Sequence, residues 1–321
     1  MSCEMSIRLQ FMQPVTVEEF SVNTASGTLN ALIHTPDLPG PLPWLVLVDG
    51  SGEGTADGWG EAPQRLAAAS AVVLSMDKPG CGKSPGDWRL QTFPDGAEES
   101  LAALKALKAH PLLDGSQTGF YGVSQGGWIS LLAAAMSDDV DFLISVSGPG
   151  VSPAEQERYR IETDLRSSEL NAADIAAGLS WLDERTQLLL ANKSAEQVLD
   201  LQRKFIDQPG YQLTTRYFDD VEMLSFLARN LGFDPEAVLP KVHCPVLATF
   251  GADDKLVPIP QSVVAFSQLL NPLAGNPHGL AVFPGADHGL YLDELKPGVS
   301  RSSQLAPGFM PMVQGFLARF A

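Results

Sequence analysis

The sequence predicts an α/β fold in which a mostly parallel β-sheet is flanked by helices and carries an inserted helical cap. Two observations predict this class. Short apolar runs alternate with helical patterns over most of the 321 residues, with Gly or Pro between them, and such alternation is typical of parallel sheets. One long segment, 152–240, departs from the alternation because its patterns are helical throughout.

The predicted strands are short runs of apolar and β-branched residues. Residues 15–20 and 28–34 form two early strands joined by a turn at Ser26 and Gly27. WLVLV, at the start of 44–50, is apolar without interruption, which indicates a strand buried on both faces. The remaining predicted strands are 71–77, 118–122, 141–148, 245–251 and 279–285.

Helical patterns fill the intervals between these strands. Thr92 and Asp95 have capping-box spacing, and the helix that starts there runs to about His110, before Pro111. The other predicted helices lie near 61–69, over 126–136, between 251 and 279, and over 303–320.

The segment 152–240 is too long to be one crossover between neighbouring strands. Ser152 with Glu155, and Ser194 with Gln197, have capping-box spacing. One helical face is marked by Ile175, Leu179 and Leu182. We therefore expect a helical cap, or lid, over the carboxyl edge of the sheet, with residues 1–151 and 241–321 forming the core.

Composition and charge narrow the class of protein. Hydrophobic residues make up 45% of the chain, enough for the core of a soluble protein. With 21 Lys and Arg against 38 Asp and Glu, the net charge is −17, so nucleic acid is not expected as a partner. No apolar run approaches the ~18 residues that span a bilayer, so no membrane association is expected.

The N-terminus and the cysteines predict a cytoplasmic protein. The first twenty residues include Glu4 and lack a continuous apolar stretch, so no secretory signal is expected. Cys3, Cys81 and Cys244 are far apart and odd in number, which predicts neither a disulfide framework nor a C-x-x-C site. The oligomeric state is not indicated by the sequence.

Ser124 lies in the pentapeptide Gly122-Val123-Ser124-Gln125-Gly126, which fits G-x-S-x-G between a predicted strand and a predicted helix. A sharp turn there would expose the serine at its tip, and it would require glycine two residues away on both sides. The helix would direct its amino end at the reacting centre, so that the Gln125 amide could donate to an oxyanion. Ser124 is the predicted nucleophile.

A serine hydroxyl needs a base, and His288 is the predicted one. It lies in FPGADHGLY, a loop after a predicted strand, and it follows the serine in the chain as the order Ser…Asp…His requires. Asp287 beside it is expected to be a local turn residue. The four other histidines, expected to have structural or surface roles, are His34, His110, His243 and His278.

The third member of a triad is a carboxylate that orients the imidazole. TFGADDKLVP (249–258) offers Asp253 and Asp254 after a strand, between the serine and the histidine. Adjacent side chains cannot both point at His288, and we predict Asp254, with Asp253 as the alternative. A second oxyanion donor is expected in the glycine-rich loop after 44–50, from Ser51 or, second, Gly52.

No cofactor or metal is expected. Gly82-Lys83-Ser84 looks like the end of a phosphate-binding loop, but Asp77 stands where that motif requires glycine. We expect Asp77 and Lys83 to be structural. No H-E-x-x-H, calcium loop or G-x-G-x-x-G between a strand and a helix occurs.

With these motifs in order, residues 15–150 and 240–321 resemble the α/β-hydrolase superfamily. The segments that carry the resemblance are GVSQGG, GADDKLVP and GADHGL, with SMDKPGCGKSPG similar to a D-x-x-G-x-G-x-S loop of bacterial carboxylesterases and serine-aminopeptidase-like hydrolases. The resemblance implies a triad of Ser124, His288 and Asp254, and an oxyanion hole formed by the amides of Gln125 and Ser51. One departure is that the usual His-Gly pair after the third strand reads Asp49-Gly50 here.

The leading hypothesis is a serine esterase that cleaves small carboxylic esters through an acyl-enzyme. Thioesters, lactones and amides share this chemistry, as do acyl transfer to another alcohol and C–C bond hydrolysis. The apolar faces of the cap suggest a hydrophobic substrate portion. A non-catalytic binding protein is disfavoured because the three triad residues all occur in the required order.

Overall fold

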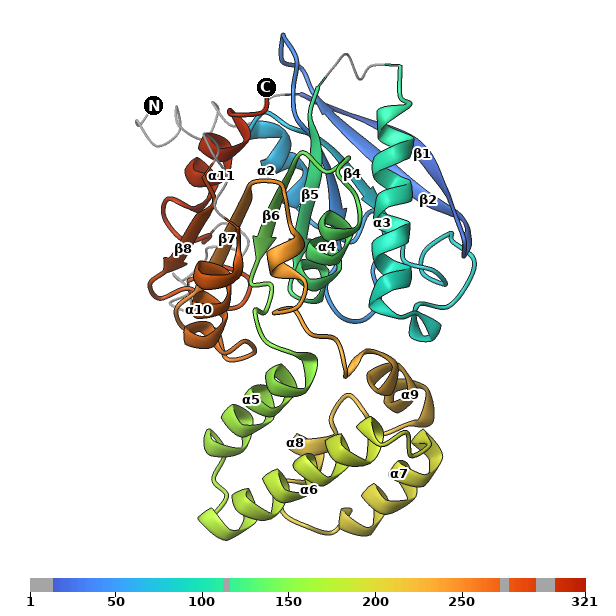
Figure 1. Cartoon of the computed structure of the whole chain (residues 1–321), viewed down its shortest axis with the longest axis vertical. Helices are drawn as coiled ribbons and strands as arrows, with labels where there is room; N and C mark the ends of the chain where they lie inside the picture. The colour runs from blue at the N-terminus through green and yellow to red at the C-terminus, as the bar shows by residue number, and fades with distance from the viewer. Residues whose placement is uncertain (1–13, 112–115, 272–276, 293–303) are drawn as a thin grey trace, which may run out of the picture.

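An eight-stranded β-sheet forms the centre of the computed structural model, which describes residues 14–111, 116–271, 277–292 and 304–321 (Figure 1). The strand order is β1-β2-β4-β3-β5-β6-β7-β8. The strands are β1 (Val15–Thr24), β2 (Gly27–Pro36), β3 (Trp44–Val48), β4 (Val72–Met76), β5 (Thr118–Val123), β6 (Phe142–Val146), β7 (Val246–Gly251) and β8 (Gly279–Phe283). β2 is antiparallel to β1 and β4, and every pairing from β4 to β8 is parallel. The predicted fold class is confirmed.

Strand β3 shows how the two faces of the sheet are filled. Trp44, Val46 and Val48 belong to one apolar cluster, and Leu45 and Leu47 belong to another. Because successive side chains of a strand point to opposite faces, an uninterrupted apolar run supplies both clusters at once. This explains why WLVLV shows no polar alternation.

Helices cover both faces of the sheet (Figure 1). The first cluster includes side chains from α3 (Phe93–Lys108), α4 (Gln125–Met136) and α10 (Ile259–Leu269). The second includes side chains from α2 (Ala62–Ala68) and α11 (Phe309–Leu317). Helix α11 is shorter than the predicted 303–320, of which residue 303 lies outside the described part of the chain.

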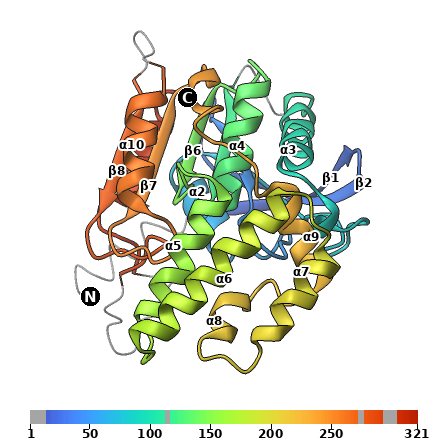
Figure 2. The same ribbon diagram turned by 60° about the horizontal axis from the view of Figure 1, so that its bottom comes forward.

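A run of helices separates β6 from β7, as the sequence predicts. They are α5 (Pro153–Arg166), α6 (Ala172–Leu190), α7 (Ala195–Gln202), α8 (Tyr211–Thr215) and α9 (Val221–Asn230). Figures 1 and 2 show them gathered at one end of the sheet. Short 3-10 turns lie at η1 (Trp88–Leu90), η2 (Arg203–Phe205) and η3 (Leu239–Lys241).

The predicted helix starts follow their capping signals. Thr92 with Asp95 and Ser152 with Glu155 form complete capping boxes at α3 and α5. At α7 the Ser194 hydroxyl accepts a hydrogen bond from the Gln197 amide at 3.4 Å. The reciprocal half of that box is not among the hydrogen bonds of the described residues, so this predicted box forms only in part.

The described residues bear on two predictions, that of no membrane span and that of no disulfide. No helix among them has both the length and the apolar character of a membrane span. Cys81 and Cys244 are buried free thiols. Cys3 and the rest of the segment 1–13, on which the expectation of no secretory signal depends, lie outside the described residues.

The carboxyl ends of the parallel strands set the location of the predicted site. Parallel strands bring these ends to one edge of the sheet, where α/β proteins bind ligands. β3 ends just before Asp49, and β5 ends just before Ser124. Asp254 follows β7 and His288 follows β8. The topology therefore brings all the predicted site residues to one edge.

Candidate active site

Ser124 forms the tip of a sharp turn between β5 and α4. Its backbone has φ 55° and ψ −120°, a conformation that non-glycine residues rarely adopt. The Ser124 amide donates to the Val146 carbonyl of β6 at 2.9 Å, which ties the turn to the neighbouring strand. The side chain thus projects from the edge of the sheet on a rigid support.

The glycines on both sides of Ser124 are required by close backbone contacts. A Cβ atom on Gly122 would lie 2.7 Å from the carbonyl carbon of Gly126. A Cβ atom on Gly126 would overlap the Val48 carbonyl and lie 2.8 Å from the Asp49 carbonyl oxygen. Both distances are below any normal contact, which confirms the prediction that this turn requires glycine at both positions.

His288 and Asp254 are joined by a hydrogen bond. Nδ1 of His288 lies 2.7 Å from Oδ2 of Asp254, whose side chain is fully buried. Oδ1 of the same carboxylate accepts the amides of Leu256 at 2.7 Å and Val257 at 3.0 Å. These bonds hold the carboxylate against Nδ1, and a proton kept on Nδ1 leaves the lone pair of Nε2 available as a base.

The alternative acid, Asp253, is exposed, whereas Asp254 is buried. Its amide donates to the Ala286 carbonyl at 2.9 Å, which ties the loop after β7 to the loop after β8. Asp287 accepts the amides of Gly289 and Tyr291 through Oδ1, as expected of a local turn residue. These bonds stabilise the loop that presents His288.

Ser124 and His288 are not hydrogen-bonded in this structure. Among the described residues the Ser124 hydroxyl forms no hydrogen bond. The His288 side chain is 21% exposed. Hydrogen bonds between catalytic groups often form or shorten only when substrate binds. The structure therefore brings together two of the three predicted residues and leaves the third at the same edge of the sheet.

The predicted oxyanion donors lie beside the serine. Gly50 borders Ser124, since a Cβ atom built on Gly50 would lie 3.6 Å from that of Ser124. The Ser51 hydroxyl lies 2.9 Å from Oε1 of Gln125. The backbone amides of Ser51, Gly52 and Gln125 form no hydrogen bond with any described residue, whereas the Gly50 amide donates to Oδ1 of Asp49 at 2.9 Å. The amides of Gln125, Ser51 and Gly52 are thus all free in the described structure, and Gln125 directly follows Ser124 in the chain.

Lys78 is a residue of this site that sequence reasoning missed. Its ammonium donates to the Gly52 carbonyl at 2.7 Å and also to the Gly50 carbonyl. It lies 5.6 Å from the centre of the Trp88 ring. Burial lowers the pKa of Lys78 and raises the pKa of Asp49, and the attraction between their opposite charges offsets part of both shifts. No local sequence signal could have found it, because only the sheet order, in which β4 lies beside β3, brings Lys78 to the loop after β3.

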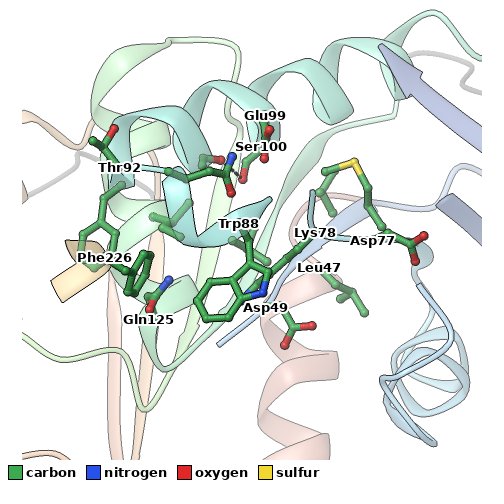
Figure 3. Close-up of a pocket in the computed structure, with 17 residues that line it drawn as sticks. Leu47, Asp49, Asp77, Lys78, Trp88, Thr92, Glu99, Ser100, Gln125 and Phe226 are labelled. Carbon is green, nitrogen blue, oxygen red and sulfur yellow. Dashed lines mark hydrogen bonds between the residues drawn. The ribbon is translucent and has the colours of Figure 1, made fainter. Parts of the chain in front are cut away.

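A small cavity of about 60 Å³ lies behind these residues, between η1, α3 and α9 (Figure 3). Gln125, Lys78 and Asp49 are among its lining residues, together with aromatic side chains that include Trp88 and Phe226. Glu99 reaches it from α3; its Oε1 has no partner among the described residues, and burial raises its pKa. The cavity itself is lined by neither Ser124 nor His288.

Asp77 and His278, both expected not to be catalytic, have structural surroundings. Asp77 is buried and accepts the amides of Ala56 at 2.7 Å and Lys83 at 2.9 Å, and the Ser84 hydroxyl at 3.0 Å. This carboxylate holds the loop in which the phosphate-loop fragment lies. His278 accepts the Val246 amide at 3.0 Å and so joins two elements of the core.

Comparison with known proteins supports the fold. A sequence profile of the alpha/beta hydrolase family matches residues 45–297. No curated protein sequence matches the chain. A hypothetical protein from Pseudomonas aeruginosa is similar in structure, with a TM-score of 0.62 and 16% identity over 97% of this chain and 96% of that one.

Two further solved structures are similar to this chain. Est1E from Butyrivibrio proteoclasticus, solved with ferulic acid bound, has a TM-score of 0.57 and 18% identity over 94% of this chain and 98% of that one. An esterase from Pyrococcus furiosus has a TM-score of 0.59 and 14% identity over 95% of this chain and 92% of that one. At these identities the similarity establishes a shared fold.

The family profile covers residues 45–297, which is most of the 321 residues and includes the helices between β6 and β7. Membership indicates a hydrolase that acts on a small molecule. This match, together with the eight-stranded sheet and its serine turn, shows that the chain belongs to the alpha/beta hydrolase family.

Proposed function

We propose that this protein is a serine hydrolase that cleaves carboxylic esters through an acyl-enzyme on Ser124. His288 acts first as general base and then as general acid, and Asp254 orients it. The amides of Gln125 and Ser51 form the oxyanion hole. The observation that carries the proposal is the bond between His288 and the buried, doubly anchored Asp254, at the same sheet edge as a strained serine.

Each step of the reaction has a residue available for it. The Ser124 hydroxyl attacks the ester carbonyl while Nε2 of His288 takes its proton, and the carbonyl oxygen becomes an oxyanion that the two amides stabilise. His288 then gives the proton to the departing alcohol. Water, activated by the same imidazole, attacks the acyl-enzyme and releases the acid. Because Ser124 and His288 are not hydrogen-bonded in this structure, the first step requires Nε2 of His288 to come within hydrogen-bond distance of the Ser124 hydroxyl.

The inserted helices complete the proposal as a cap over the site. Residues 152–240 would bound the acyl group, since α5 begins shortly after β6, at the edge where Ser124 lies. The Tyr159 hydroxyl of α5 donates to the Asp254 carbonyl at 3.3 Å, which brings the cap into contact with the acid loop. We also propose a cytoplasmic location, in keeping with the buried free thiols of Cys81 and Cys244.

The proposal is tested with p-nitrophenyl esters of graded chain length, beside thioester and lactone substrates, on wild type and Ser124→Ala. We expect ester hydrolysis by the wild type and its loss in the variant, with a fluorophosphonate probe labelling only the wild type. A wild type that hydrolyses no ester and is labelled no faster than Ser124→Ala would contradict the proposal. Faster turnover of thioesters than esters would instead identify a thioesterase on the same residues.

A further inference from the structure

The loop after β3 is bound by one ammonium group, that of Lys78. Lys78 follows β4, the strand next to β3 in the sheet, and its Nζ donates to the carbonyls of Gly50 and Gly52. Two carbonyls can face one ammonium because Gly52 has φ 91°, a conformation that L side chains rarely adopt. The loop is thus bound at two points on either side of Ser51.

We propose that Lys78 is a positioning residue that aims the Ser51 amide at the developing oxyanion. A peptide unit is planar and trans, so its carbonyl and its N–H point in opposite directions. Because Lys78 binds the Gly50 carbonyl, the N–H of the same peptide unit, which belongs to Ser51, must point away from Lys78. The inference rests on the proposed function, since it concerns the oxyanion hole of that reaction.

Asp49 supports the same orientation from the other side of Gly50. Its Oδ1 accepts the Gly50 amide, which leaves the Ser51 amide as the next donor along the loop. Its side chain packs against Gly54, where a Cβ atom would lie 2.9 Å from Cγ of Asp49. The negative charge of Asp49 also favours the charged form of Lys78. The peptide units 49–50, 50–51 and 52–53 therefore each have one fixed group, and the unit that joins Ser51 to Gly52 lies between two fixed ones.

The surroundings hold Lys78 itself in place. Its backbone amide donates to the Gly54 carbonyl at 2.9 Å, which ties the end of β4 to the far end of the loop. The ammonium also lies over the ring of Trp88, 5.6 Å from the ring centroid, within reach of a cation–π interaction. A held donor is what an oxyanion hole requires, because its dipoles must be oriented before the charge develops.

The test compares Lys78→Met with the wild type on the best ester of the panel. Met is unbranched like Lys and only one atom shorter, but it removes every donor. We expect kcat to fall by about 10²–10³-fold, the usual effect of losing one oxyanion donor, with little change in KM. Lys83→Met is the matched control: Lys83 is exposed, pairs with Glu19, and should leave the rate unchanged.

A second measurement separates positioning from general support of the loop. A trifluoromethyl ketone forms an adduct with Ser124 whose oxyanion occupies the hole, so its affinity should fall by the same factor as kcat/KM in Lys78→Met. Lys78→Arg, which keeps donors and charge, should recover part of both. A folded Lys78→Met with kcat within about threefold of wild type, or with unchanged ketone affinity, would overturn the proposal.

Two further outcomes keep the inference distinct from the proposed function. If Lys78→Met does not fold, Lys78→Gln serves instead, since it can reach only one carbonyl; full activity in that variant would also overturn the inference. If the wild type has no esterase activity, or Ser124→Ala keeps it, the proposed function fails. An active wild type, an inactive Ser124→Ala and a fully active Lys78→Met would reject the role of Lys78 alone.

Discussion

At the scale of single residues, the backbone of Ser124 is held in a conformation that costs about 1–3 kcal/mol. Neighbouring contacts maintain it: the amide is bonded to β6, and the flanking glycines leave no room for movement. Such strain persists where the surrounding structure over-determines it, and it fixes a side chain at the tip of the turn. The side chain of Ser124, the proposed nucleophile, is therefore placed by the backbone.

Asp254→Asn gives a direct test of the acid at this scale. The amide could keep one oxygen for the backbone donors at Leu256 and Val257, but its NH₂ would then face Nδ1 and force the wrong tautomer on His288. We expect kcat for an ester to fall by about 10³–10⁴-fold with KM nearly unchanged, measured by steady-state kinetics. Asp253→Asn, at the exposed neighbouring position, is the control and should keep the wild-type rate. The reverse result would assign the acid to Asp253.

At the scale of elements, the packing of α4 against β3 depends on glycine, whereas that of α11 does not. Because Gly126 has no side chain, it lies directly against the backbone of Val48 and Asp49, so α4 can approach the sheet closely. Gly315 lies in α11 with nothing near its missing side chain. One glycine is required by a contact, and the other only weakens its helix.

Alanine at these two positions should have opposite effects on stability. Gly126→Ala forces a methyl group into a backbone carbonyl, and we expect it to reduce the free energy of unfolding by at least about 3 kcal/mol. Gly315→Ala should raise it by about 0.5–1 kcal/mol, because alanine loses less chain entropy in a helix. Chemical denaturation of both variants measures the difference. Equal effects would show that the contact at Gly126 is relaxed in solution.

The elements themselves could largely be predicted from the sequence. Apolar runs such as WLVLV and capping boxes such as Thr92–Asp95 are local signals, and the structure contains both. Ser124 was identifiable for the same reason, since its turn requires glycines at fixed offsets. Strand and helix ends differ from the prediction by a few residues, because tertiary packing decides where an element stops.

Lys78 could not be found in this way. Its partners, the carbonyls of Gly50 and Gly52, carry no side-chain signature, and they lie on a different loop. Only the order β4-β3 in the sheet brings the lysine under that loop. In the same way, nothing local distinguishes Asp254 from Asp253; burial and the bond to His288 distinguish them in the folded chain.

At the scale of the whole molecule, the inserted helices are joined to the core at α9. Phe226 of α9 belongs to the same apolar cluster as Trp88 and Phe93, and its ring meets that of Trp88 with centroids 5.2 Å apart. Asn230, at the end of α9, is buried and bonds to the first turn of α3. Core and inserted helices thus share one packed region, so we expect them to unfold together.

Asn230→Ala measures how strongly that junction holds. Oδ1 of Asn230 accepts the Phe93 amide at 2.7 Å, and Nδ2 donates to the Phe226 carbonyl at 3.0 Å. Removing them leaves a buried amide without a partner, and we expect a loss of about 2 kcal/mol in the free energy of unfolding. Arg229→Ala, which removes an exposed bond to the Arg89 carbonyl, should cost less than about 0.5 kcal/mol. Thermal and urea unfolding of both variants test the comparison.

The lysine under the Gly50–Gly52 loop has a consequence for how this sequence can change over generations. Asp49 and Lys78 compensate each other's charge and hold opposite sides of one loop, so losing either would leave its partner without a counterpart. The two positions should consequently be inherited as a pair. In an alignment of relatives, lysine at position 78 should accompany aspartate at 49 and be absent where histidine stands there, and exchanging both residues at once should be tolerated better than exchanging one.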